Sequence, residues 1–134
     1  MTLPINHFKR DKFAELCGIE LLEVKTGYAR AKMDIKPCHK NSLDFAHGAA
    51  MFALADFVFA VASNSYETIA VGINTSMSFV KAVKDGTIFA VANEKSVNPK
   101  IAVYEVIITD NDGDTVGIFQ GMVYRKKDSI YIYD

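Results

Sequence analysis

The sequence has too few cysteines for the fold to depend on cross-links. Cys17 and Cys38 are the only two in 134 residues, and at this spacing they make neither a disulfide framework nor a zinc site. The chain also lacks a cluster of metal ligands, the glycine patterns of dinucleotide and phosphate loops, and the Gly-x-Ser-x-Gly turn of serine hydrolases. We therefore expect a chemistry that uses no metal and no bound cofactor.

The chain has no excess of charge of either sign. It carries 15 Lys and Arg against 16 Asp and Glu, a net charge of -1, with the two signs mixed along the sequence. This balance gives no electrostatic reason to bind nucleic acid or an acidic membrane. The N-terminal residues also lack the apolar core of a signal peptide. We expect a soluble cytoplasmic protein with neither nucleic acid nor membrane as a partner.

What the sequence does contain is apolar residues, which make up 50% of the chain. A chain of this length and composition can bury one core. We therefore expect a single domain over residues 1–134. Within it, residues 1–17 form an N-terminal helical segment and residues 128–134 a C-terminal tail.

One long apolar stretch organises the rest of the sequence. From Gly48 to Tyr66 the only charged residue is Asp56, and the only glycine stands at the start. The stretch is too long and too rich in alanine for a strand, so it predicts a helix that ends near residues 63–65 and is buried on every face. Its uncharged arms are shorter than the roughly 18 residues of a membrane span. A carboxylate buried without a partner is unfavourable, which makes Asp56 the first indication of chemistry.

The remaining pattern is mostly that of strands. Residues 7–16 predict a short surface helix closed by Gly18, and residues 37–46 predict a loop before the long helix. Alternation and turn residues predict strands over residues 19–24, 28–35, 69–80, 87–97, 102–109 and 116–125. The tail 129–133 adds a short strand or packs as an extension. Turn-linked strands with one long helix indicate an α+β fold with a mostly antiparallel six-stranded sheet.

The segment from Asn41 to Asp56 resembles the active-site signature of the hotdog thioesterases, in particular the phenylacetate-degradation (PaaI-type) acyl-CoA thioesterases. The family pattern has an Asn six residues before the His of a His-Gly-Gly, and an acid eight residues after the first Gly. Asn41, His47, Gly48 and Asp56 fall at those spacings. The resemblance extends from about residue 18 to residue 125. It implies the hotdog fold, in which a mostly antiparallel six-stranded sheet wraps a long central helix.

The sequence departs from the family pattern at three places. Ala49 stands where the family has its second glycine, which is tolerable if the position keeps helical dihedrals. Lys81 and Ala82 stand where an Arg-Pro pair is common, which leaves the details of coenzyme binding open. Ala60 stands one turn after the acid, where some relatives carry a hydroxyl. The carboxylate of Asp56 is therefore not assisted from position 60.

The resemblance implies an acyl-CoA thioesterase that acts as a homodimer or homotetramer on an aromatic or medium-chain acyl group. The start of a helix offers unpaired N–H groups, so the N–H of Gly48, with or without that of Ala49, is the expected oxyanion donor. Asp56 lies eight residues further on, about 12 Å along the axis. In the family, the acid of one subunit faces the helix start of the other. We therefore expect each site to combine Gly48 and His47 of one chain with Asp56 of its partner, as general base or nucleophile.

Other residues near the signature carry weaker expectations. Asn41 holds the water or the thioester, or is only the Asx-turn residue of its loop. His47 orients the loop or contacts substrate, or only caps the helix, and Asp44 is an alternative N-cap. Phe52 and Phe59 belong to the core, or also line an acyl pocket. The basic residues that could meet the phosphates of coenzyme A, unless they are ordinary surface residues, are Lys81, Lys84, Arg125, Lys126 and Lys127.

Two other functions are compatible with the same residues. An acyl-thioester dehydratase on this scaffold typically pairs a catalytic His with the acid, but here His47 directly precedes the helix glycine, which favours hydrolysis. A non-catalytic module that binds acyl-CoA would need no reaction at Asp56.

Overall fold

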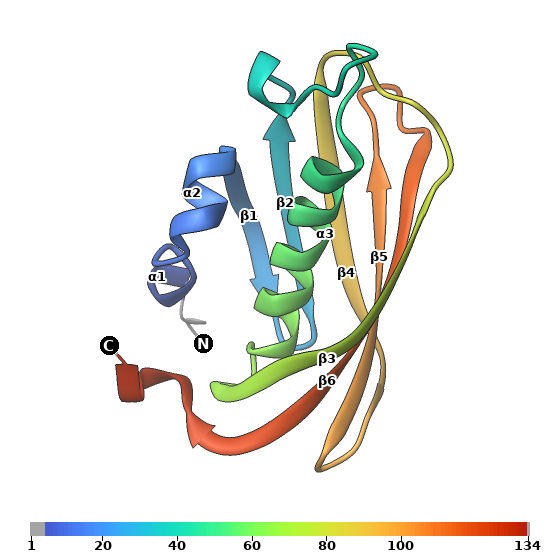
Figure 1. Ribbon diagram of the computed structural model, residues 1–134. Helices are drawn as coiled ribbons and strands as arrows, with labels where there is room; N and C mark the ends of the chain where they lie inside the picture. The colour runs from blue at the N-terminus through green and yellow to red at the C-terminus, as the bar shows by residue number, and fades with distance from the viewer. Residues whose placement is uncertain (1–4, 134) are drawn as a thin grey trace.

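The chain folds as one long helix laid across a curved sheet, with two short helices beside it (Figure 1). The computed structural model describes residues 5–131 in full and the backbone of residues 132 and 133. The elements in chain order are α1 (Ile5–Phe8), α2 (Lys12–Cys17), β1 (Ile19–Lys25), β2 (Tyr28–Asp34), a 3-10 turn (Pro37–His39), α3 (Gly48–Ser63), β3 (Thr68–Phe79), β4 (Thr87–Val97), β5 (Ile101–Thr109), β6 (Thr115–Ser129) and a second 3-10 turn (Ile130–Tyr133).

The six strands form one sheet in the order β1-β2-β4-β5-β6-β3, and every neighbouring pair is antiparallel. The sheet curves around α3, and β1 and β3 form its two edges (Figure 1). The strands that the alternation pattern predicts are all present. The α+β class and the hotdog arrangement of one central helix and an antiparallel sheet are therefore confirmed.

Close contact between α3 and the sheet depends on glycines. The ring of Phe59 packs against Tyr104 and Phe119, with ring centroids 6.0 and 5.3 Å apart. Gly121 lies directly beneath that ring, where an added Cβ would stand 2.6 Å from two ring carbons, and at Gly72 it would stand 3.1 Å from one. The absence of a side chain at these positions lets the helix settle onto the strands.

The N-terminal segment differs from the single helix that the sequence predicts over residues 7–16. It forms α1 and α2 instead, because the carboxylate of Asp11 accepts a hydrogen bond from the N–H of Ala14 at 2.9 Å and starts a new helix. Gly18 closes α2 in the left-handed conformation, with φ of 76°, as expected. The C-terminal end also differs, since β6 continues to Ser129 before the last 3-10 turn.

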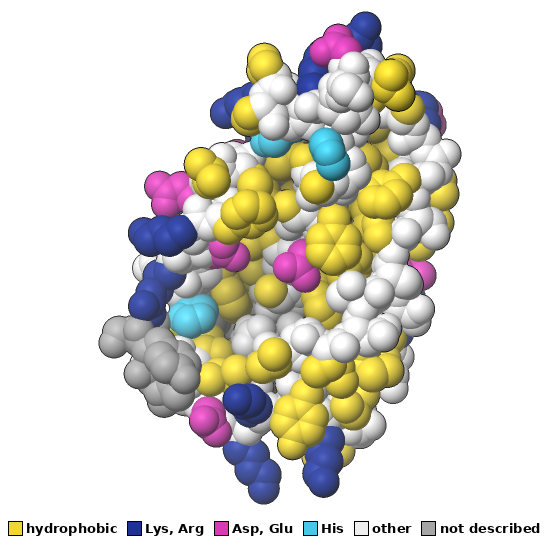
Figure 2. Space-filling view, viewed as in Figure 1, with side chains coloured by type: hydrophobic (Ala, Val, Ile, Leu, Met, Phe, Trp, Pro, Cys, Tyr) yellow, Lys and Arg dark blue, Asp and Glu magenta, His cyan; other side chains and the backbone are white. Residues whose placement is uncertain are grey.

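Helix α3 is not buried on every face, so that prediction is wrong for the single chain. One side packs on the sheet, with Leu54, Ala55 and Val58 fully buried. The opposite side is open at Ala49, Asp56 and Ala60, because α2 covers only part of it. Figure 2 shows this face as a hollow lined largely by hydrophobic side chains, with acidic side chains among them. None of the helices in the described part of the chain is long and apolar enough to cross a membrane.

Candidate active site

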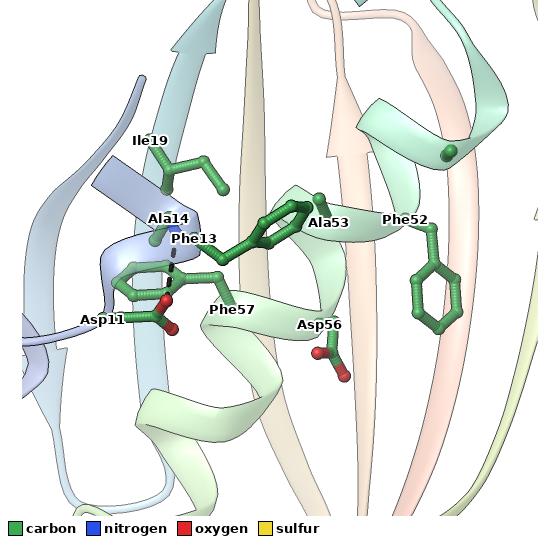
Figure 3. Close-up of a pocket in the computed structure, with 9 residues that line it drawn as sticks. Asp11, Phe13, Ala14, Ile19, Phe52, Ala53, Asp56 and Phe57 are labelled. Carbon is green, nitrogen blue, oxygen red and sulfur yellow. Dashed lines mark hydrogen bonds between the residues drawn. The ribbon is translucent and has the colours of Figure 1, made fainter. Parts of the chain in front are cut away.

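The carboxylate of Asp56 lies in a hollow between α2 and α3. The hollow has a volume of about 450 Å³, and its walls are mostly apolar side chains from both helices and the start of β1 (Figure 3). Phe52, Ala53 and Phe57 belong to α3, and Phe13 and Ile19 face them. Within residues 5–131, Asp56 has no hydrogen-bond or ion-pair partner, and in particular no arginine holds it. A carboxylate in such surroundings is available to a bound molecule.

The surroundings of Asp56 also change its acidity. Partial burial of the carboxylate among apolar side chains raises the pKa of Asp56, and the nearby negative charge of Asp11 raises it further. Asp11 lines the same hollow from the first turn of α2 (Figure 3). A raised pKa makes the ionised carboxylate a stronger base, and titratable groups perturbed in this way are common at functional sites.

The N-terminus of α3 leaves one backbone donor open. His47 is the N-cap, and its Nδ1 accepts a hydrogen bond from the N–H of Ala49 at 2.9 Å. The N–H groups of Ala50 and Met51 donate to the carbonyl of His47. Among the described residues, the N–H of Gly48 has no acceptor. The geometry therefore favours Gly48 over Ala49 as an oxyanion donor, and it makes His47 the helix cap, a role for which the sequence offered Asp44 as an alternative.

The loop before α3 is held by Asn41. Its Oδ1 accepts hydrogen bonds from the N–H groups of Leu43 and Phe45, at 2.9 and 3.2 Å. This is the Asx-turn geometry that the sequence predicts as the alternative to a chemical role. Asp44 sits in the same turn with φ of 67° and lies 3.9 Å from Lys40 and from Lys84. Asp44 therefore does not cap the helix.

The two phenylalanines that we expected near the acyl group lie on different sides of α3. Phe52 lines the hollow of Asp56 and also contacts Phe119, with ring centroids 5.6 Å apart. Phe59 is only 2% exposed and points into the core above the sheet. Within one chain, only Phe52 is brought together with Asp56.

Two of the basic residues expected to meet coenzyme A donate hydrogen bonds within the chain, and a third, Lys84, lies 3.9 Å from Asp44. Lys81 donates hydrogen bonds to Asp110 and Asp114, at 2.7 and 2.8 Å, and these carboxylates raise its pKa. The side chain of Arg125 donates to the carbonyl of Asn98 at 2.8 Å. Arg125 also pairs with the start of β3, near the C-terminal end of α3 and away from Gly48. The structure does not bring either residue to the hollow.

One group of acidic residues has the composition of a metal site. Asp110, Asp112 and Asp114, in the turn between β5 and β6, can place their carboxylates within 4.8 Å of one another. Lys81 already pairs with two of them, and Gly113 has φ of 83°, as the tight turn requires. The turn accounts for these residues without an ion.

The sequence did not predict that α2 and the start of β1 form one side of the hollow that holds Asp56. Asp11, Phe13 and Ile19 line the hollow of Asp56, yet they precede Asp56 by more than thirty residues. The available signal was the Asp that can cap a helix, followed by apolar residues at helical spacing. That signal predicts a helix with an apolar side, but it does not say what the side faces.

Comparison with known proteins finds relatives that match most of the chain. A family model described as the thioesterase superfamily matches residues 43–117, which include Gly48 and Asp56. A relative from Archaeoglobus fulgidus is 36% identical over 88% of this chain and 77% of its own length. The acyl-coenzyme A thioesterase PaaI of Escherichia coli K12 is 29% identical over 88% of this chain and 85% of its own length.

Solved structures show the same arrangement of elements. A mutant of the phenylacetic acid degradation protein PaaI from Thermus thermophilus is 30% identical, with a TM-score of 0.83 over 87% of this chain and 100% of that one. The PaaI protein of E. coli is 26% identical in its solved structure, with a TM-score of 0.89 over 93% of this chain and 91% of that one.

Proposed function

The chain belongs to the thioesterase superfamily, and on that premise we propose that it is an acyl-coenzyme A thioesterase. The observation that carries the proposal is the unpartnered carboxylate of Asp56 in an apolar hollow. The helix that bears it begins with an open N–H at Gly48. The E. coli relative named an acyl-coenzyme A thioesterase supports the same substrate class.

In the proposed reaction, Asp56 activates the attack on the thioester carbonyl carbon. As a general base it takes a proton from a water whose oxygen forms the new C–O bond. The negative charge that develops on the carbonyl oxygen is met by the N–H of Gly48 at the positive end of α3. Collapse of the intermediate breaks the C–S bond, and the thiolate of coenzyme A takes up the proton. In the alternative route Asp56 attacks directly and water then hydrolyses the resulting anhydride.

We propose that each site is built from two copies of the chain. Asp56 and Gly48 of one helix are separated by about 12 Å along its axis, too far for one thioester to meet both. Strand β3 is an unpaired edge with apolar side chains exposed on it: Val71 is 44% exposed and Ile73 is 53% exposed. Such an edge supports pairing with a second copy, which would bring another helix start toward Asp56.

The acyl group in this proposal occupies the hollow lined by Phe52, and the site uses no metal or bound cofactor. Coenzyme A would extend toward solvent, where Lys84 is 60% exposed in its side chain. Lys81 and Arg125 would need to exchange their present partners before they could bind phosphate. Asn41 would act on the site through the loop that it holds in front of α3.

The test is hydrolysis of a panel of acyl-CoAs, followed with a thiol reagent, by the unchanged chain and by Asp56→Asn and Asp56→Ala. We expect both variants to lose about a hundredfold or more in kcat, with the fold and the oligomer retained. The control is Asp128→Asn, since Asp128 is exposed on β6 and outside the hollow. Most of the rate remaining in both Asp56 variants would contradict the assignment. Tight binding of acyl-CoA without turnover by the unchanged chain would instead indicate a binding module.

A further inference from the structure

A second hollow lies beside the one that holds Asp56. Its volume is about 250 Å³, and it extends toward the N-terminal end of α3, where Cys17, Cys38, His47 and Ala50 line it. Ala49, Ala53 and Phe13 line both hollows. Among these shared residues only Phe13 has a large side chain. Its ring is therefore the group that separates the two hollows.

The position of this ring is well defined by its helix. Phe13 is 62% exposed, and Figure 3 shows its ring directed from α2 toward Ala53 of α3. Helix α2 is fixed at its start by the cap of Asp11. At its end, Nε2 of His39 donates to the carbonyl of Cys17 at 2.8 Å. The ring therefore stands on an anchored backbone, with little protein packed on its outer side.

We propose that Phe13 sets the length of the acyl group by closing the Asp56 hollow against the second one. The inference rests on the proposed thioesterase function and adds its substrate preference. A short or compact acyl group fits within the first hollow. Two further hollows share Asp11 and Phe57 with the first, and both are lined by charged side chains: Asp11 with Lys9, Glu15 and Glu20 in one, and Asp11 with Arg10 in the other. Among the described residues, no Asp, Glu, Lys or Arg lines the second hollow, so the uncharged route for a longer chain runs past position 13. An alkyl chain is unfavourable beside an ionised group, whereas the alanines and thiols of the second hollow are suitable for it.

The experiment compares kcat/KM for straight-chain acyl-CoAs from butanoyl- to dodecanoyl-CoA in three chains: unchanged, Phe13→Ala and Leu16→Ala. Leu16 is a matched control, since it lies on the same helix, is 79% exposed and lines neither hollow. We expect Phe13→Ala to raise the ratio of long-chain to short-chain kcat/KM by about tenfold or more, because added methylenes then find an apolar space. Leu16→Ala should keep the original profile. A Phe13→Trp variant should shift the profile toward shorter chains.

Three results would distinguish failure of this inference from failure of the proposed function. The same chain-length profile in Phe13→Ala as in the unchanged chain would overturn the inference, as would an equal shift in Leu16→Ala. No hydrolysis of any acyl-CoA by the unchanged chain would overturn the proposed function itself. Circular dichroism and urea unfolding of each variant establish that the overall fold is kept.

Binding can be followed independently of turnover through the two thiols of the second hollow. In the Asp56→Asn background, dodecanoyl-CoA should slow the alkylation of Cys17 and Cys38 by iodoacetamide when Phe13→Ala is also present. The chain that retains Phe13 should show no such protection. Equal protection in both chains would also overturn the inference.

Discussion

At Asp56, a single neighbouring residue is expected to tune the chemistry. Asp11 faces the same hollow, and its negative charge adds to the effect of burial in raising the pKa of Asp56. In the proposed reaction, the carboxylate can act as base or nucleophile only when it is ionised. The raised pKa therefore makes the rate fall on the acidic side at a higher pH than an ordinary aspartate would.

The Asp11→Asn variant tests this coupling. Asparagine caps a helix about as well as aspartate, so α2 should be preserved while the charge is removed. Loss of a nearby negative charge lowers the pKa of Asp56, and the acidic limb of the kcat/KM profile should move to lower pH. The rate near neutral pH should change little.

The control for Asp11→Asn is Glu15→Gln, on the same helix but outside the hollow of Asp56. It should leave the acidic limb in place. An acidic limb that stays in place in Asp11→Asn, or one that moves equally in Glu15→Gln, would show that Asp11 does not act on Asp56.

At the scale of elements, the packing of α3 against the sheet fixes the positions of both ends of the helix. Phe59 anchors the helix on β6 above Gly121. The open side of the same helix then carries Asp56 into the hollow, and its first turn presents Gly48. Packing on one face of α3 therefore positions the proposed catalytic groups on the rest of the helix.

Gly121→Ala should destabilise the fold. The new methyl group would stand 2.6 Å from the ring of Phe59 and 2.9 Å from that of Phe119, and both rings are buried. Overpacking of this kind typically costs about 1–3 kcal/mol, measurable as a lower midpoint in urea unfolding. Phe59→Leu introduced together with Gly121→Ala should recover part of the loss. Full stability of Gly121→Ala alone would mean that the helix can move away from the sheet without loss.

For the whole molecule, the central question is whether Gly48 and Asp56 of one site come from the same chain or from two chains of a dimer. Gly48→Pro removes the backbone N–H at the first position of α3, where proline is tolerated. If the site is shared, mixed dimers of Gly48→Pro and Asp56→Asn contain one site with both changes and one site with neither. Co-refolding equal amounts of the two inactive variants should then restore about a quarter of the original rate. Each variant refolded alone serves as the control and should stay inactive. A mixture that remains at the sum of the two controls would place Gly48 and Asp56 in the same chain's site.

The sequence by itself determined the long helix, the six strands and the residues of the signature. The apolar run over Gly48 to Ser63, broken only by Asp56, predicts a helix, and alternation with turn residues predicts the strands, because both signals are local. The spacing of Asn41, His47, Gly48 and Asp56 likewise needs no coordinates to be read.

The tertiary structure alone decided which side of α3 is covered and what faces Asp56. Burial of the helix on all sides was the natural expectation from its composition, yet the sheet covers one side only and α2 leaves the other open. Our proposal of Gly48 rather than Ala49 as oxyanion donor depends on one hydrogen bond, from the N–H of Ala49 to Nδ1 of His47. The proposed role of Phe13 depends on its lying beside Ala49 and Ala53, more than thirty residues away in the sequence. Local pattern carries no information on such contacts, since they arise only when separate elements pack together.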